Sequence, residues 1–162
     1  MISKAEQSVT IISATSAHVA DFHAIELQVS PSPWTAGQFE ESLRHHSAYV
    51  LQQSGNVCGF LIFSCIAGSA ELINIAVAPA HQGQGLGSRL LGFCLECVEG
   101  KADSIFLDVR VSNFPAISMY ANKGFVQVGE RRDYYRKPHG REDALVMAYE
   151  LNANLFASDD QD

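Results

Sequence analysis

Residues 72–88 read LINIAVAPAHQGQGLGS, and this stretch decides how the rest of the chain is interpreted. Its first half is a continuous apolar run typical of a buried strand. Gly83, Gly85 and Gly87 then lead directly into an apolar helical pattern. Because glycine lacks a side chain, backbone N–H groups in such a loop can point at an anion where the helix begins. The stretch therefore predicts a strand, a loop and a helix that together bind a phosphorylated ligand.

Two familiar phosphate-binding motifs do not fit this spacing. A dinucleotide fingerprint needs a third glycine three positions after the second, but Ser88 follows Gly85 at that distance and Leu90 follows Gly87. A P-loop needs Gly-Lys before Ser or Thr, and no lysine lies between residues 4 and 101. A glycine-rich turn without a ligand stays open as the structural alternative.

The composition is that of one acidic globular domain. The chain has 162 residues, with 18 acidic and 11 basic side chains and a formal net charge of −7. A chain of about this size can bury enough surface to fold without a metal or a disulfide. The acidic balance disfavours a general nucleic-acid-binding protein and suits a cationic peptide substrate. We expect a single domain over residues 1–162, with a core at about 9–151 and a flexible tail at 152–162.

The sequence also bears on compartment and metal content. Its start lacks the apolar segment and cleavage site of a signal peptide, and no run approaches the roughly 18 apolar residues of a membrane span. Cys58, Cys65, Cys94 and Cys97 show no disulfide framework. Cys94 and Cys97 form a C-x-x-C inside a helical pattern, and no second pair has zinc-ligand spacing. We expect a cytoplasmic protein with reduced thiols, no membrane contact and no metal site.

Strand and helix patterns follow one another in the order βααβββαβαββ. Strands are expected at about 9–12, 48–53, 57–66, 70–77, 105–109, 125–128 and 145–151, and helices at about 15–29, 35–46, 86–98 and 115–122. Thr35 and Gln38 fit a capping box at the start of the second helix, and Gly124 ends the fourth. The order predicts an α/β fold with a mixed sheet and helices on its faces.

The loop does match the spacing of one known pattern. Gln82-x-x-Gly85-x-Gly87 resembles the signature of the GNAT acyltransferase superfamily, and residues 74–77, 108–113, 116–120 and 123–125 resemble neighbouring parts of that fold. Residues 33–35, 131–135 and 140–147 are similar to one branch, the ribosomal-protein alanine N-acetyltransferases. The resemblance implies a mostly antiparallel sheet of about seven strands, flanked by about four helices, with central strands 4 and 5 splayed apart.

The resemblance implies an enzyme that moves an acetyl group from acetyl-CoA to the α-amino group of an N-terminal alanine. The implied partners are CoA and the basic N-terminal peptide of the eighteenth small-subunit ribosomal protein, with no sequence-specific nucleic acid. Two alternatives stay open. One is a GNAT enzyme that acetylates another N-terminus, a lysine or a small amine, and the other is an acyl-CoA-binding module without catalysis.

The resemblance also assigns binding residues. Main-chain groups of Ile75, Ala76 and Val77 would align the pantetheine arm, and the Val77 N–H would stabilise charge on the thioester oxygen. The pyrophosphate would be held by Gln82, Gly83, Gln84, Gly85, Leu86, Gly87 and Ser88. Asn113 would hydrogen-bond the cofactor. The acceptor would be lined by Trp34, Tyr134 and Tyr135, for which packing roles are the alternative.

Two proton transfers complete the implied chemistry. Tyr120 matches the family's tyrosine acid, and an ordinary tyrosine pKa near about 10 keeps it protonated; a core aromatic is the alternative. The branch uses a glutamate base where this chain has Asp108, which is shorter by one methylene, about 1.5 Å. Our first hypothesis is that Asp108 acts through a water, and the second is that Glu71 is the base. A solvent-facing or capping Asp108 stays open.

One further group of side chains stands out near the end of the chain. This basic cluster consists of Arg131, Arg132, Arg136, Lys137 and Arg141. A solvated hairpin face is one interpretation, and contact with rRNA or with acidic parts of an acceptor is the other.

Overall fold

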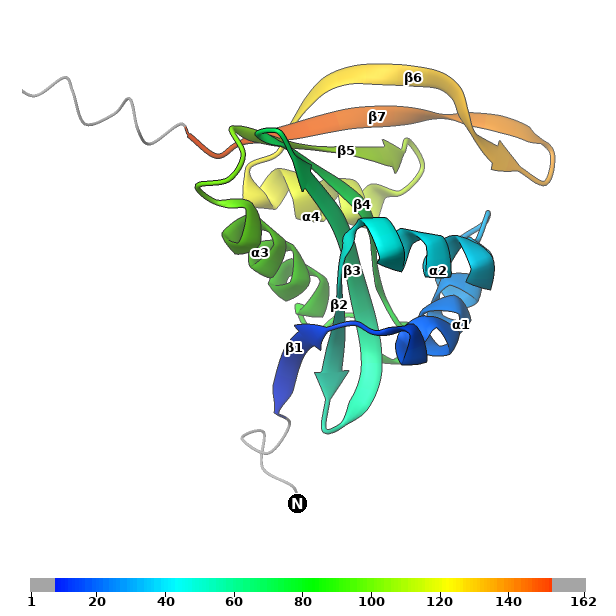
Figure 1. The fold of residues 1–162 in the computed structure, drawn as a ribbon. Helices are drawn as coiled ribbons and strands as arrows, with labels where there is room; N and C mark the ends of the chain where they lie inside the picture. Colours follow the sequence, from blue (N-terminus) through cyan, green and yellow to red (C-terminus); the bar gives the residue numbers. More distant parts are fainter. Residues whose placement is uncertain (1–7, 153–162) are drawn as a thin grey trace, which may run out of the picture. The chain divides into compact units, whose positions relative to one another are not determined.

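The computed structural model describes residues 8–152, and its elements follow the predicted order (Figure 1). The strands are β1 (Val9–Ser13), β2 (Ser47–Gln53), β3 (Asn56–Ile66), β4 (Ser69–Val77), β5 (Ser104–Arg110), β6 (Val126–Lys137) and β7 (Gly140–Glu150). The helices are α1 (Val19–Val29), α2 (Ala36–His45), α3 (Leu86–Val98) and α4 (Phe114–Lys123), with 3₁₀ turns η2 (Ser16–His18) and η3 (Pro79–His81). The expected tail lies outside the described residues, apart from residue 152.

The strands form one sheet in the order β1-β2-β3-β4-β5-β7-β6. The pairs β1–β2, β2–β3, β5–β7 and β6–β7 are antiparallel. The β4–β5 pair is parallel, and its register joins Ser69–Glu71 to Ser104–Phe106. The expected α/β fold with a mixed, mostly antiparallel sheet of seven strands and four helices is therefore confirmed.

The described residues pack as two compact units. Unit 1 comprises residues 8–63 and 74–91, and unit 2 comprises residues 64–73 and 92–152. In unit 1, Phe22 of α1, Phe39 of α2 and Phe60 of β3 are fully buried. Their rings lie 4.8 Å (Phe22–Phe60) and 5.4 Å (Phe39–Phe60) apart between centroids. This aromatic core holds both helices against the sheet of unit 1.

Gly59 explains how closely β3 approaches the end of β4 in unit 1. A Cβ atom at position 59 would lie 2.8 Å from the carbonyl oxygen of Ala76, a contact that real Cβ atoms essentially never make. The Ala78 N–H also donates to the Cys58 carbonyl at 2.8 Å. The Gly59 backbone therefore lies close to the Ala76 carbonyl, and Cys58 is bonded to Ala78. Because both neighbours are main-chain groups, β3 fixes the backbone of the segment that the resemblance assigns to the cofactor.

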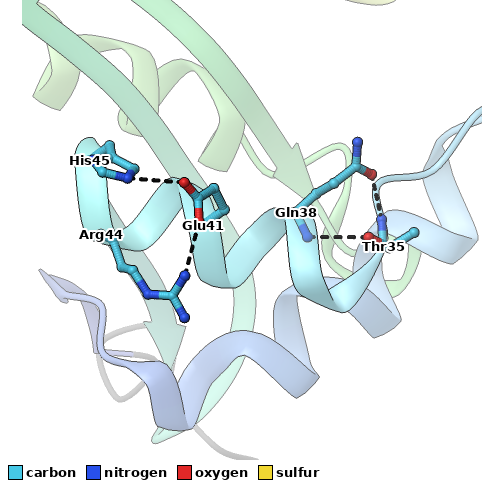
Figure 2. A network of polar contacts seen from close by, with 5 residues as sticks. All are labelled: Thr35, Gln38, Glu41, Arg44 and His45. Carbon is cyan, nitrogen blue, oxygen red and sulfur yellow. Dashed lines mark hydrogen bonds and ion pairs between the residues drawn. The ribbon is translucent and has the colours of Figure 1, made fainter.

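Helix α2 begins with the predicted capping box (Figure 2). Thr35 Oγ1 accepts a hydrogen bond from the Gln38 N–H at 3.1 Å, and Gln38 Oε1 accepts one from the Thr35 N–H at 2.8 Å. One turn later Glu41 pairs with Arg44 and with His45 on the exposed face. The cap ends the α1–α2 loop at a defined residue.

In unit 2, β5 alternates between two faces as a strand must. Ile105, Leu107 and Val109 are buried, whereas Asp108 lies on the opposite face. Gly124, with φ +109°, ends α4 as predicted.

The last two strands differ from the sequence prediction. They were expected at 125–128 and 145–151, but β6 continues to Lys137 and β7 begins at Gly140. Nearly every residue of β6 is exposed, so the strand lacks the apolar alternation that reveals a half-buried strand.

No helix among the described residues combines the length and apolar character needed to cross a membrane.

Candidate functional site

The end of β4 and the glycine loop, both in unit 1, form the candidate cofactor-binding segment. Ile75, Ala76 and Val77 are half-buried and lie beyond the residues that pair with β5, which leaves main-chain groups on that edge for a ligand. The Gln82 side chain turns back and donates through Nε2 to the Val77 carbonyl at 3.0 Å. This bond fixes where the loop leaves the strand.

The glycines then set up the start of α3. Gly83 and Gly85 have φ of +79° and +76°, a conformation that side-chain-bearing residues rarely adopt. The Arg89 N–H donates to the Gly85 carbonyl at 3.1 Å and closes the first helical turn. The N–H groups of residues 86–88 lie in that turn and have no partner within the helix. Together with the helix dipole they fit an anionic group such as a pyrophosphate.

Leu86 and Gln84 were both predicted to hold the pyrophosphate, but their side chains have different surroundings. The Leu86 side chain is buried, at 5% exposure, so only its backbone can serve a ligand. The Gln84 side chain accepts a hydrogen bond from Gln53 Nε2 at 3.2 Å. Gln53 Oε1 also lies 2.9 Å from His81 Nδ1. Gln53, at the end of β2 and 8% exposed, therefore braces both ends of residues 81–84.

A second buried polar pair holds the beginning of the cofactor segment. Asn74 Nδ2 donates to Glu26 Oε2 of α1 at 3.0 Å, and Glu26 is 5% exposed. A buried carboxylate requires such donors, and here the donor comes from β4. Trp34, in the α1–α2 loop, packs on Phe39 with ring centroids 5.1 Å apart. Its predicted contact with an acceptor stays a prediction.

Asp108, the first candidate base, lies in unit 2 and is paired with an arginine. Arg131 Nε donates to Asp108 Oδ1 at 3.0 Å, with 17% of the Asp108 side chain and 53% of the Arg131 side chain exposed. This hydrogen bond raises the pKa of Arg131, and the charge of Glu71 adds to the rise. Glu71 pairs with Phe106, two residues before Asp108, so both candidate bases lie on one face of the sheet.

Two tyrosines lie against arginines of unit 2, one of which is the Arg131 that pairs with Asp108. Arg110 Cζ lies 4.3 Å from the centre of the Tyr135 ring, and Arg131 Cζ lies 5.6 Å from that of Tyr134. Burial raises the pKa of Tyr135 to about 12, and the Asp108 charge contributes to this rise. Unit 2 thus brings the predicted acceptor residues Tyr134 and Tyr135 together with Asp108.

The basic cluster is exposed, but part of it is bonded within unit 2. Arg131 of this cluster is bonded to Asp108. Lys137 Nζ lies 3.8 Å from Glu142 Oε2, and Arg141 donates to the Asp133 carbonyl at 3.2 Å. Arg110 pairs with Glu142 at 3.0 Å. Burial raises the pKa of Glu142, but hydrogen bonds from Ser112 and Arg110 and the Lys137 charge outweigh it, so the pKa is lowered overall. Part of the basic cluster is therefore bonded within the hairpin, and Glu142 also links the hairpin to β5.

Comparison with known proteins identifies the family. The acetyltransferase (GNAT) family model matches residues 17–125. The chain belongs to this family.

Several curated relatives of the chain carry the name ribosomal protein bS18-alanine N-acetyltransferase. The chain is 34% identical over 145 residues to the ribosomal protein bS18-alanine N-acetyltransferase of Escherichia coli K12, with 88% of this chain and 98% of that protein covered. It is 36% identical over 129 residues to the Haemophilus influenzae protein of the same name, with 78% and 88% covered. The crystal structure of the Escherichia coli enzyme superposes with a TM-score of 0.83 and 34% identity, covering 89% of this chain and 94% of that one.

Tyr120 and Asn113, two further residues named for the GNAT chemistry, also have structural roles in unit 2. Tyr120 of α4 is 6% exposed and packs on Phe125, with centroids 5.8 Å apart. Burial raises the pKa of Tyr120 well above its ordinary value, and Tyr135 and Cys94 add to this, so its hydroxyl stays protonated. Asn113 Oδ1 caps α4 by accepting from the Ala116 N–H at 3.3 Å. The cap uses Oδ1 of Asn113 and does not involve the Nδ2 donor.

The C-x-x-C motif of this GNAT protein lies within α3, in unit 2. Burial raises the pKa of Cys94 to about 12, and Cys97 and Cys65 add to this rise, so its thiol stays protonated at neutral pH. All four cysteines are free thiols. Residues 8–152 contain no group of three or more His, Cys, Asp or Glu side chains that could hold a metal ion.

Proposed function

We propose that this GNAT protein is a cytoplasmic N-terminal acetyltransferase that transfers the acetyl group of acetyl-CoA to the N-terminal alanine of ribosomal protein bS18. The observation that carries the proposal is its 34% identity to the Escherichia coli enzyme of that name, over 98% of the length of that protein. The proposed partners are CoA and a basic N-terminal peptide, with no sequence-specific nucleic acid and no membrane.

Acetyl-CoA supplies a thioester whose carbonyl carbon is open to attack by an amine. The main chain of Ile75, Ala76 and Val77 would align the pantetheine arm, and the loop from Gln82 to Ser88 would hold the pyrophosphate with Asn113 as an additional donor. The positive φ of Gly83 and Gly85 supports this assignment, and so do the N–H groups at the start of α3 that have no partner within the helix.

The proposed acceptor side consists of residues that line the peptide and residues that transfer protons. Trp34, Tyr134 and Tyr135 would line the acceptor peptide. Asp108, directly or through a water, would collect the proton of the attacking amine, with Glu71 as the rival base, and Tyr120 would protonate the leaving thiolate. No covalent bond to the enzyme is required, since the amine is itself the nucleophile.

Mass spectrometry of peptides tests the proposed function. The enzyme is incubated with acetyl-CoA and a basic peptide that begins with alanine and contains an internal lysine. A matched peptide has its α-amine blocked. We expect one acetyl group on the α-amine of the first peptide and none on the second. Acetylation of lysine on either peptide would point to another acceptor class, and no transfer despite acetyl-CoA binding would indicate a binding module.

A prediction about the cofactor follows from Gln53. Removing its side chain in Gln53→Ala breaks the bonds to Gln84 and His81. At roughly 0.5–1.5 kcal/mol for each hydrogen bond, KM for acetyl-CoA should rise about 5–100-fold while kcat changes less than about twofold. Steady-state kinetics with varied acetyl-CoA measures this. Gln52→Ala is the matched control, and an equal KM in both variants would contradict the role of Gln53.

A further inference from the structure

The β6 strand contains a bulge next to Arg131 in unit 2. Arg131 pairs with Ala144 of β7, whereas Tyr135 pairs with Glu142, so three residues of β6 stand opposite one residue of β7. Asp133, inside the bulge, has φ +52°. β-Bulges are frequent beside active sites, where they change the direction of a side chain. The bulge is therefore a candidate device for placing a neighbouring residue.

Two hydrogen bonds hold the bulge in this conformation. The Asp133 N–H donates to Asp143 Oδ1 at 2.8 Å, and Arg141 Nη1 donates to the Asp133 carbonyl at 3.2 Å. Both partners belong to β7. Asp133 is thus hydrogen-bonded through both its N–H and its carbonyl, as expected where the surrounding structure maintains an uncommon φ.

From this position the Arg131 side chain reaches across β7 to β5. Ala144 pairs with Arg131 on one side and with Arg110 on the other, and Asp108 lies two residues before Arg110. Ala144 is buried and small, so its side chain leaves room for the guanidinium to cross. Arg131 Nε then meets Asp108 Oδ1 at 3.0 Å, with Tyr134 against the guanidinium.

This ion pair differs from an ordinary surface pair, which contributes little to stability. Its carboxylate is mostly covered, and the bond joins Nε to a single carboxylate oxygen. Binding at Oδ1 fixes the rotation of the carboxylate and assigns proton transfer to the other oxygen, Oδ2. It also places a positive charge beside the base, which would repel an acceptor that arrives as an ammonium ion.

We propose that Arg131 is a positioning residue for the base Asp108: it orients the carboxylate and favours the acceptor in its neutral amine form. The inference rests on the proposed function. In the step it serves, the amine lone pair forms the N–C bond while the C–S bond breaks. The amine proton passes to Asp108 Oδ2, directly or through a water, and the thiolate receives its proton from Tyr120.

The test compares Arg131→Gln with Arg131→Lys and with Arg132→Gln, an exposed neighbour, using an alanine peptide as acceptor. A hydrogen bond to a charged group has an effect of about 10–100-fold. We expect Arg131→Gln to lower kcat by that factor without raising the KM for the peptide. Arg131→Lys should recover part of kcat because it keeps the charge, and Arg132→Gln should stay within about twofold of the wild type.

A pH series separates positioning from a merely structural role. An α-amine titrates near about 7.7–8.0, so the peptide is mostly ammonium at pH 6.5. Arg131→Gln should bind it there with a lower KM than the wild type, and the difference should vanish at pH 8.5. Equal kcat in Arg131→Gln and Arg132→Gln, or a raised KM with unchanged kcat, would overturn the inference. Failure of the wild type to acetylate the α-amine would instead overturn the proposed function.

Discussion

Replacing Asp108 by asparagine is expected to lower kcat/KM for the alanine peptide by about 10²–10⁴-fold, the usual contribution of a general base. Asparagine keeps the size of the side chain and an oxygen that can accept from Arg131, but it cannot take up the proton of the amine. The fold should survive, because Asp108 lies on the polar face of β5, opposite the buried Leu107 and Val109. Steady-state kinetics between pH 6 and 9, with a thermal melt of each variant, measures both effects.

Two companion variants make this result decisive. Asp108→Glu lengthens the side chain by about 1.5 Å and should retain activity, since a longer carboxylate can reach the amine without a water. Glu71→Gln removes the rival base on the same face of the sheet and should keep kcat/KM within about threefold. If Asp108→Asn keeps full kcat/KM across this pH range while Glu71→Gln loses it, Glu71 is the base and the assignment of Asp108 is wrong.

Local signals in the sequence were strong enough to predict most of the elements. The bounds of α3, Leu86–Val98, agree with the prediction, because Leu90, Leu91, Cys94 and Val98 recur at helical spacing and are all fully buried. The capping box of α2 is likewise a short-range pattern. β6 was predicted too short because a strand exposed along most of its length has no apolar alternation to detect.

The strand and the helix that flank the glycine loop of the candidate site were predicted, because their residues are neighbours in sequence. The contacts that support the site were not, because they join residues far apart along the chain: 48 positions separate Glu26 from Asn74, 31 separate Gln53 from Gln84, and 23 separate Asp108 from Arg131. A polar residue such as Gln53 at a buried end of a strand is a weak signal by itself. Arg131 was grouped with other cations by composition, and the bulge that directs it leaves no pattern in the sequence.

Tyr120→Phe is expected to lower kcat by about 10²-fold or more, within the usual range for a positioned general acid. The change removes the hydroxyl and keeps the ring that packs on Phe125. Because burial raises the pKa of Tyr120, its hydroxyl stays protonated as the pH rises past the ordinary tyrosine value near about 10. The wild type should therefore lose no activity through this group up to that pH. Steady-state kinetics at pH 7–10 measures both expectations.

Tyr149→Phe is the matched control, since Tyr149 also packs on Phe125, at 5.4 Å between centroids. It loses the same atom from the same aromatic cluster and should keep kcat within about twofold. The two interpretations of Tyr120 differ in where the effect appears: a proton donor affects kcat at unchanged thermal stability, whereas a core aromatic affects the melting temperature. If Tyr120→Phe keeps kcat and lowers the melting temperature, the thiolate must receive its proton from another donor or from solvent.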